Sequence, residues 1–299
     1  MSNPPSVGFN PLTWFFNQDG YHPELAPPLE EIYRQIKKSG FDAVFAEVPA
    51  GMGIADYRAL LAEVGLEPAP GYFQASFADS TRLPGVVEAA KRVAAQQQEL
   101  GLSRIFIAES FGAAPLRAQR PAIGAGFDQA RLQSIAENLG VVAAAMTAEG
   151  VRPCLHQHIG TWIETPDELQ FVLDNTSPDE LLFGPDTGHL AWAGADPATV
   201  IAANLPRVGA VHLKDFHAAQ AERAISASLP YASATIAGDG ERVWTEPGNG
   251  DIDLDAVLRV LSGFDGWYVV EVDVADQPTP ADTANVSAAW VREHLGGPA

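Results

Sequence analysis

The 299-residue chain has few basic residues, a single cysteine and no long apolar run, and each shortage excludes a class of protein. Acidic residues outnumber Lys and Arg by 38 to 18, so the formal net charge of −20 repels nucleic acids and anionic lipid headgroups. Cys154 has no second cysteine for a disulfide, and no apolar run approaches the roughly 18 residues of a membrane span. The first residues, MSNPPSVGFN, lack the basic and apolar regions of a secretion signal. We therefore expect a cytoplasmic protein that binds neither nucleic acid nor a membrane.

Two common catalytic motifs are also missing. The Gly-rich run from Glu246 to Asp253 does not match the glycine spacing of dinucleotide-binding or ATP-binding loops. No Gly-x-Ser-x-Gly elbow of the kind used by serine hydrolases occurs. We interpret the Gly-rich run as a tight loop before a helix, and expect neither a nucleotide cofactor nor a serine nucleophile.

Short β-rich runs alternate with longer helical stretches, a pattern typical of a parallel α/β protein. The expected strands cover residues 7–10, 43–47, 67–72, 104–109, 152–156, 181–186, 210–213 and 268–271. The expected helices cover residues 29–38, 56–64, 85–100, 129–149, 167–174, 197–204, 254–261 and 282–294. Gly40, Gly65 and Gly150 each follow a helix, where glycine takes a left-handed conformation. Eight βα units without a composition break predict one domain over residues 1–299, a single (β/α)₈ TIM barrel.

The stretch at about residues 216–243 departs from this pattern, because it is long, rich in Ala and Ser, and without clear periodicity. Long βα connections in barrels usually lie over the active site. We expect a lid-like excursion that excludes water, with too few large apolar side chains to form a rigid core element.

Polar side chains gather at the ends of the predicted strands, where a (β/α)₈ barrel carries its catalytic groups. Four consecutive late strands end in His156, Asp186, His212 and Glu271. Any one of these alone is readily explained as a helix cap, an ion-pair partner or a core histidine. Four in succession favour a site for one divalent cation, because these nitrogen and oxygen donors suit Mn²⁺, Co²⁺, Fe²⁺ or Zn²⁺.

Further donors stand beside these four. His158 lies two residues after His156, so both point to the same face of an extended strand, and which of them binds the metal stays open. His189 follows the sixth strand across a glycine turn, and Lys214 follows the seventh strand. A neighbouring cation would disfavour the ammonium form of Lys214, so both residues are candidates for acid/base work.

Motifs in the second half of the chain resemble the xylose-isomerase-like superfamily of sugar isomerases and epimerases, and within it the inosose dehydratases. The Asp-Thr-Gly-His and His-Leu-Lys-Asp motifs carry the superfamily resemblance, whereas His-x-His-x-Gly-Thr favours the dehydratases, which share a His where many epimerases have a Glu ligand. The Gly8 to Trp14 run is similar to the family's first strand and loop. The motifs, in the family's order, are His156 to Thr161, Asp186 to His189, Val211 to Asp215, Pro247 to Asp253 and Val269 to Glu271.

The resemblance implies a metal-dependent dehydratase that forms an enolate of a cyclic keto-polyol, such as an inosose, and then eliminates water. The alternative is a keto-sugar isomerase or epimerase that uses the same enolate chemistry. A non-catalytic polyol-binding protein is disfavoured, because it leaves the metal donors without a purpose. We expect Mn²⁺ or Co²⁺ and a small polyol or sugar as partner, and a homo-oligomer stays open. The implied residues are His156, Asp186, His212 and Glu271 for the metal, His189 and Lys214 for catalysis, and His158, Glu47, Asn10 and Trp14 for the substrate.

Overall fold

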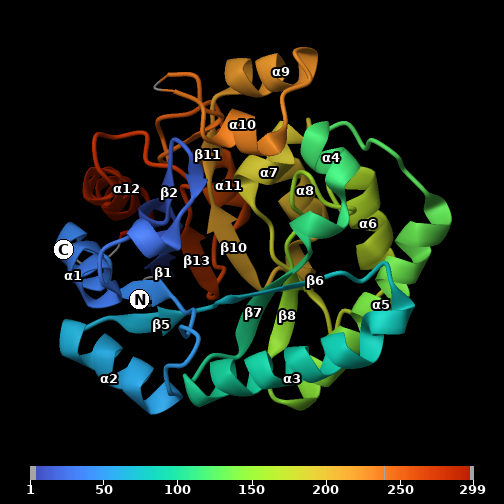
Figure 1. Ribbon diagram of the computed structural model, residues 1–299, viewed down its shortest axis with the longest axis horizontal. Coiled ribbons are helices and arrows are strands. Elements are labelled where there is room, and N and C mark those ends of the chain that lie inside the picture. Colours follow the sequence, from blue (N-terminus) through green and yellow to red (C-terminus); the bar gives the residue numbers. More distant parts are fainter. Residues whose placement is uncertain (1–4, 239, 297–299) are drawn as a thin grey trace.

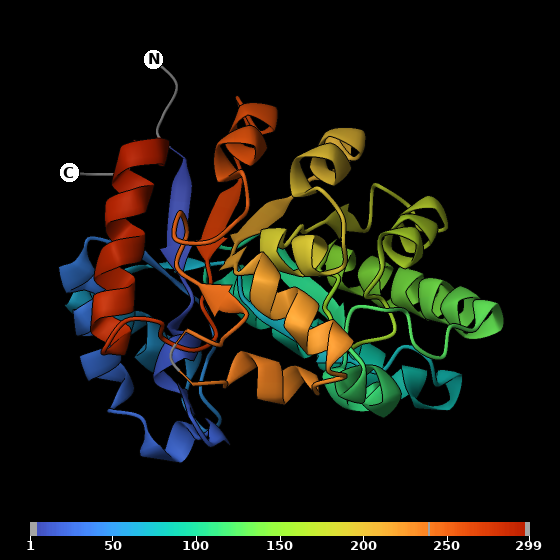
Figure 2. The ribbon, with the colours of Figure 1, turned by 90° about the horizontal axis from the view of Figure 1, so that it is seen from above.

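A barrel of parallel strands forms the centre of the molecule, for which the computed structural model describes residues 5–238 and 240–296 (Figures 1 and 2). Hydrogen bonding joins the strands in the orders β10-β13-β1-β4-β5 and β6-β7-β8-β9. The chain between β5 and β6 connects the two sheets on one side, and isolated parallel bridges connect β9 to β10 on the other, so the barrel closes as the sequence predicts. The barrel strands are β1 (Ser6–Phe9), β4 (Ala43–Phe45), β5 (Glu67–Ala69), β6 (Tyr72–Ala75), β7 (Arg104–Glu109), β8 (Arg152–Leu155), β9 (Leu182–Phe183), β10 (Ala210–Leu213) and β13 (Trp267–Val270).

Helices surround the strands, and shorter elements lie in the connections. The surrounding helices are α1 (Leu29–Ser39), α2 (Ile54–Val64), α3 (Leu83–Glu99), α5 (Gln129–Ala148), α6 (Pro166–Asp174), α8 (Pro197–Ala203), α11 (Leu254–Val260) and α12 (Pro280–Leu295). The connections contain α4 (Pro115–Gln119), α7 (Thr187–Trp192), α9 (Ala218–Ser226), α10 (Tyr231–Thr235), the ribbons β2 (Phe16–Asn17) with β3 (Gly20–Tyr21) and β11 (Asp215–Phe216) with β12 (Trp244–Thr245), and 3₁₀ turns at Pro11–Trp14, Pro23–Leu25, Ser80–Arg82, Phe111–Ala113 and Leu205–Arg207. Within the described residues, none of the helices has the length and apolar character needed to span a bilayer.

Strand side chains alternate between two apolar cores. Phe9 and Ile107 face outward into the core shared with the helices, whereas Phe106 and Cys154 face into the barrel. Gly8 keeps the interior narrow, since a Cβ there would lie 2.6 Å from the Cβ of Ala69. Burial raises the pKa of Cys154 to about 12, so the only thiol is an unreactive core group.

The spacing of apolar residues explains the helices. In α1 the side chains of Ile32, Tyr33 and Ile36 are buried against the outer core, as a 3.6-residue period requires. The helix ends at Gly40, whose φ of 113° is a left-handed conformation that other residues adopt with strain. The predicted boundaries of the eight surrounding helices agree with the structure to within a few residues.

The third predicted strand, residues 67–72, is wrong as a single element. It is split into β5, which pairs with β4, and β6, which pairs with β7. At the break, Gly71 donates its N–H to Gln97 Oε1 at 3.0 Å, and its carbonyl accepts from the N–H of Phe106 at 2.9 Å. A Cβ on Gly71 would lie 2.2 Å from the carbonyl oxygen of Ala46, so the change of partner depends on glycine at this position.

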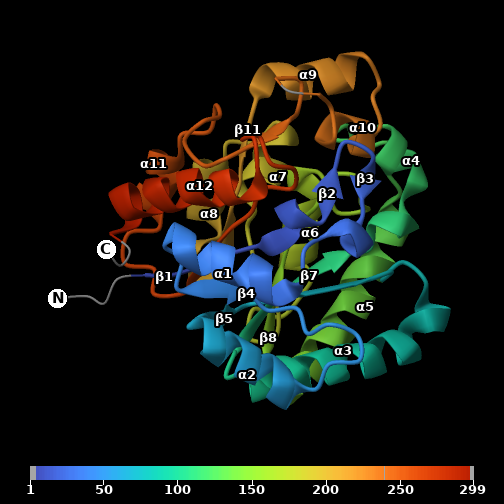
Figure 3. The same cartoon turned by 60° about the vertical axis from the view of Figure 1, so that its left-hand side comes forward.

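The stretch at 216–243 is more ordered than the sequence predicts. It forms α9 and α10, with α10 between α9 and the barrel (Figures 1 and 3). The expectation of too few apolar anchors is wrong, because the segment forms a second apolar core together with residues of other elements. The larger members of that core are Ile159, Trp192, Phe216, Tyr231 and Trp244. That this segment moves as a lid stays a prediction.

Replacing Gly71 by Ala is expected to destabilise the protein by about 1–3 kcal/mol, because the new methyl group overlaps the backbone at Ala46. Gly85→Ala is the control, since Gly85 lies near the start of α3, where a Cβ would meet no neighbouring atom within 4 Å. Urea unfolding followed by circular dichroism should show a lower midpoint for the Gly71 variant and an unchanged or higher one for the control. Equal midpoints for the two variants would contradict the proposed constraint.

Candidate metal centre and active site

The four predicted metal ligands meet at one end of the barrel. His156 follows β8, His212 lies in β10, Glu271 follows β13, and Asp186 lies beyond β9, bridged to His212. All four side chains are buried, with at most 6 % of each residue exposed. Nδ1 of His212 is 3.6 Å from both Asp186 Oδ2 and Glu271 Oε2, and the rings of His156 and His212 are 5.0 Å apart. The structure therefore brings together residues that are far apart in the sequence.

Several polar atoms of this cluster have no hydrogen-bond partner. Among the described residues they include Nδ1 of His156, Oδ2 of Asp186 and both ring nitrogens of His212. The other Asp186 oxygen accepts the backbone N–H of His189 at 2.8 Å, which holds the free oxygen beside His212. Leaving a buried polar atom unpaired costs about 1–3 kcal/mol, and imidazole with carboxylate is a donor set that suits a divalent cation. The residues present thus fit a metal ion.

Among the residues that the structure describes, three overlapping groups of donors are compact enough to hold an ion, each with donor atoms within 4.8 Å of one another. The groups are His156 with Asp186 and His212, Asp186 with His189 and Glu271, and His156 with His158 and His189. The first two groups together contain all four predicted ligands. His158 occurs only in the third group, and its ring lies 5.3 Å from that of Tyr231 in α10.

His158 and His189 face each other, with 3.9 Å between their ring centroids, and the backbone of Ile159 contacts both. Nδ1 of His158 is 2.7 Å from the Ile159 carbonyl, so Nδ1 carries the proton and Nε2 is left as an acceptor. The Ile159 N–H donates to Nδ1 of His189 at 3.4 Å, so Nε2 of His189 carries the proton. Burial lowers the pKa of both rings, that of His189 well below its ordinary value, so both are neutral. The site therefore presents one acceptor nitrogen beside one donor nitrogen.

Lys214 is held as an ammonium ion by two carboxylates, and the expectation that a neighbouring cation disfavours this form stays a prediction. Its Nζ donates to Glu271 Oε1 and Asp273 Oδ1, both at 2.7 Å, and lies 4.6 Å from the ring centroid of Trp244. Burial by itself lowers the pKa of Lys214, but the carboxylates of Asp273 and Glu271 outweigh it and raise the pKa well above its usual value. Lys214 is therefore a proton donor in this structure and not a base.

Two of the predicted substrate residues lie at the barrel end that carries the cluster. Asn10 is buried, and its Nδ2 donates to Glu271 Oε2 at 2.6 Å, so it orients a predicted metal ligand. Glu47 follows β4, and its side chain is exposed, without a hydrogen bond or ion pair to any described residue. A direct contact of either residue with substrate stays a prediction.

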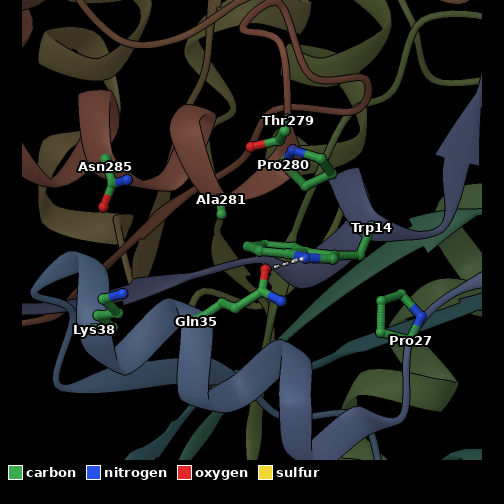
Figure 4. Close-up of a pocket in the computed structure, with 8 residues that line it drawn as sticks. All are labelled: Trp14, Pro27, Gln35, Lys38, Thr279, Pro280, Ala281 and Asn285. Carbon is green, nitrogen blue, oxygen red and sulfur yellow. Dashed lines mark hydrogen bonds between the residues drawn. The ribbon is translucent and has the colours of Figure 1, made fainter.

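The structure contradicts the prediction that the ring of Trp14 faces the substrate. Its Nε1 donates to Gln35 Oε1 at 3.1 Å, and its ring packs against Phe9 of the outer core. The ring lines a cavity of about 640 Å³ between α1 and the start of α12, with Lys38 and Asn285 on its rim (Figure 4). Trp14 ends the 3₁₀ turn that follows β1, and its ring contacts α1 and the outer core, a placement that the residue pattern does not reveal.

Two functional candidates were missed by sequence reasoning. Tyr231 of α10 donates its hydroxyl to Asp273 Oδ2 at 3.0 Å, and its ring lies 5.3 Å from that of His158. Phe111 packs against both Tyr231 and His158, at 5.0 and 5.9 Å between ring centroids. These aromatic rings form the wall of the site on the side of the lid segment. Tyr231 had no sequence signal, because it lies on α10 and not at the end of a predicted strand.

A buried acidic pair holds the loop that follows β8. Glu164 accepts the backbone N–H of Gly160 at 2.9 Å and two further N–H groups from the loop after β7. Glu168 forms a two-point ion pair with Arg117, at 2.7 and 2.6 Å. Gly160 has a φ of 87°, and a Cβ there would lie 2.5 Å from the Phe111 ring. The Gly of the His-x-His-x-Gly-Thr motif is thus required by local geometry.

The Gly-rich run is structural, as the sequence predicts. Asp215 accepts four backbone N–H groups, two of them from Gly248 and Gly250, and so fixes the loop. Asp253 then caps α11 by accepting the N–H of Ala256 at 2.8 Å.

Comparison with known proteins identifies the family. Residues 33–294 match the family model described as "Xylose isomerase-like TIM barrel", and the chain belongs to this family. The inosose dehydratase of Geobacillus kaustophilus (strain HTA426) is 26 % identical over 282 residues, which cover 91 % of this chain and 88 % of that protein.

Solved structures share the fold. The IolI protein crystallised with a zinc atom superposes with a TM-score of 0.70 at 16 % identity, over 97 % of this chain and 98 % of that one. The 3-keto-D-glucoside 4-epimerase YcjR of E. coli gives a TM-score of 0.69 at 18 % identity, over 97 % and 99 % of the two chains. At these identities the likeness concerns the architecture alone.

Replacing His212 by Ala is expected to abolish metal binding while the fold survives, because the ring leaves a site of preorganised donors and no hydrogen bond of its nitrogens is lost. Elemental analysis after loading with Co²⁺ and desalting should show one ion per chain in the unaltered protein and close to none in the variant. His294→Ala, an exposed change on α12, is the control and should retain the ion. Full occupancy in the His212 variant would exclude His212 as a ligand.

Glu109, at the end of β7, accepts the N–H of Phe77 at 2.9 Å. Burial raises its pKa to about 7, so between pH ~4.5 and ~7 the folded protein retains a proton that the unfolded chain releases. The contribution of Glu109 to the free energy of unfolding therefore falls as pH rises through that window, by an amount on the order of 3 kcal/mol at most.

Glu109→Gln removes this titration and keeps an oxygen for Phe77. The variant should gain stability relative to the unaltered protein between about pH 5 and about pH 8, measured by urea unfolding. Glu99→Gln, on the exposed side of α3, should show no such pH-dependent gain. A pH-independent difference for the Glu109 variant would show that Glu109 is ionised throughout.

Proposed function

We propose that this protein is a divalent-metal-dependent hydro-lyase that removes water from a cyclic keto-polyol such as an inosose. The observation that carries the proposal is the pair of neutral histidines, His158 and His189, with opposite hydrogen-bonding states beside unpartnered metal donors. The inosose dehydratase relatives support this reaction class, at modest identity. A cytoplasmic location and a homo-oligomeric state stay predictions.

His156, Asp186, His212 and Glu271 would hold the cation, with Mn²⁺ or Co²⁺ expected and Zn²⁺ or Fe²⁺ also suited to these donors. A cation bound there would polarise the substrate ketone and stabilise the negative charge that develops on its oxygen. Asn10 and Lys214 each hold one oxygen of Glu271, so the carboxylate keeps one orientation.

The residues of the chain can supply both proton transfers. Nε2 of His158, left free by the bond from Nδ1 to Ile159, takes the proton from the carbon next to the ketone. The electron pair passes into the enolate, whose collapse breaks the β-carbon–oxygen bond, and the ammonium of Lys214 gives that hydroxyl a proton so that it leaves as water. The proton on His158 later returns to Lys214 through solvent. Nε2–H of His189 donates a hydrogen bond to a substrate oxygen.

These roles modify the sequence-based prediction. His158 becomes the base in place of His189, because its free nitrogen is the acceptor, and Lys214 acts only as the acid, because it is the group that carries a proton at the start of the reaction. His189 keeps a direct contact with substrate, as a hydrogen-bond donor.

The alternative is a keto-sugar isomerase or epimerase that returns the proton to carbon. One observation favours it: His158 and His189 lie side by side, so a proton taken by one ring is close to a second ring that can deliver it. The same base and the same enolate serve both reactions, and the fate of the β-hydroxyl separates them.

The reaction is tested by incubating the metal-loaded protein with an inosose and measuring the mass of the product. We expect the loss of one water, and a rate reduced by about 10² or more in His158→Ala and in Lys214→Met. Glu99→Gln serves as the matched surface control. Products of unchanged mass across a panel of inososes and ketoses, with a solvent proton at carbon, would assign an isomerase instead.

A further inference from the structure

A chain of hydrogen bonds leads from α10 to the predicted metal ligands. Tyr231 donates its hydroxyl to Asp273 Oδ2 at 3.0 Å, and Asp273 Oδ1 accepts from Lys214 at 2.7 Å. Lys214 also donates to Glu271 Oε1 at 2.7 Å, and Asn10 holds the other Glu271 oxygen at 2.6 Å. Every member is buried, with at most 8 % of each residue exposed. A residue of the lid segment is thus connected to the barrel interior through charged groups.

The ring and the hydroxyl of Tyr231 make separate contacts. The ring is stacked on Trp192, with centroids 5.5 Å apart and planes inclined by 21°, and borders His158. This packing belongs to the second apolar core and does not need the hydroxyl. The hydroxyl donates to Asp273 Oδ2 and also interacts with the side chain of Thr235 on the same helix. A Phe at this position therefore removes the contacts of the hydroxyl and keeps the packing of the ring.

Without the hydroxyl, Asp273 loses a donor that fixes its carboxylate. Tyr231 donates to Oδ2 of Asp273, and Lys214 donates to the other oxygen, Oδ1. Rotation of the carboxylate therefore moves the Lys214 ammonium. Lys214 is the shared donor of Asp273 and Glu271, so a shift of its Nζ also changes how Glu271 is held. Among the described residues, no third side chain donates to the Asp273 carboxylate.

We propose that Tyr231 is a positioning residue: its hydroxyl fixes Asp273, and through it the Lys214 ammonium beside Glu271. The effect on turnover rests on the proposed function, in which Lys214 protonates the departing hydroxyl. The effect on the orientation of Glu271 does not rest on the proposed function, because it follows from these hydrogen bonds alone. The α9–α10 segment thereby contributes to the reaction as well as covering the site.

Tyr231→Phe tests the proposal, with Tyr33→Phe as the matched control, because Tyr33 also loses a buried hydroxyl bond, to Tyr57 at 2.8 Å, outside the barrel. We expect Tyr231→Phe to lower kcat about 10-fold and to change KM less than about 3-fold, which corresponds to one lost hydrogen bond. The visible absorption bands of the Co²⁺-loaded protein should shift, because Glu271 is reoriented. Tyr33→Phe should change neither the kcat nor the bands.

Each outcome decides the proposal. If Tyr231→Phe matches the unaltered protein in kcat and in the Co²⁺ bands, Tyr231 only packs and the proposal is wrong. If the unaltered protein converts no keto-polyol, the proposed function fails, and the Co²⁺ bands alone decide whether Tyr231 positions the cluster. If Tyr231→Phe does not fold, Asp273→Asn takes its place, since the amide weakens the hold on Lys214 and should shift the same bands.

Discussion

The structure depends on the burial of polar donor atoms that the protein itself does not pair. Each unpaired buried atom costs about 1–3 kcal/mol, and unpaired buried charges cost more. The protein limits this cost at Asp186, whose Oδ1 accepts the N–H of His189 while Oδ2 stays free. Both oxygens of Glu271 are held, one by Asn10 and the other by Lys214. The free atoms converge between β8, β9, β10 and β13, where a cation would pair them together.

The barrel could be predicted from the sequence because its signals are local. The 3.6-residue period of α1 and the glycine at its end depend on neighbouring residues alone, and both are as expected. The split of the third strand was not visible, because it results from the close approach of Gly71 to Ala46, which are adjacent only in the folded barrel. The packing of α9 and α10 was missed for the same reason, since their apolar partners lie on other elements, such as Trp192 of α7.

The candidate site could be predicted at those positions where a metal-binding residue type stands at the end of a predicted strand. His156, Asp186, His212 and Glu271 lie together as expected, because neighbouring parallel strands bring their ends to one edge. The ion pairs that hold the Lys214 ammonium were not visible in the sequence, because Asp273 and Glu271 approach it in space from another strand. The hydrogen bonds that set the tautomers of His158 and His189 involve backbone atoms of Ile159, which no residue pattern reveals.

The placement of the cation between the barrel strands is tested most directly by anomalous X-ray scattering from crystals of the protein loaded with Co²⁺. We expect one strong peak within bonding distance of His156, Asp186, His212 and Glu271, with His158 outside the first coordination sphere. A peak bound by His156, His158 and His189, or one away from the barrel end, would contradict both the ligand assignment and the role of His158 as a base.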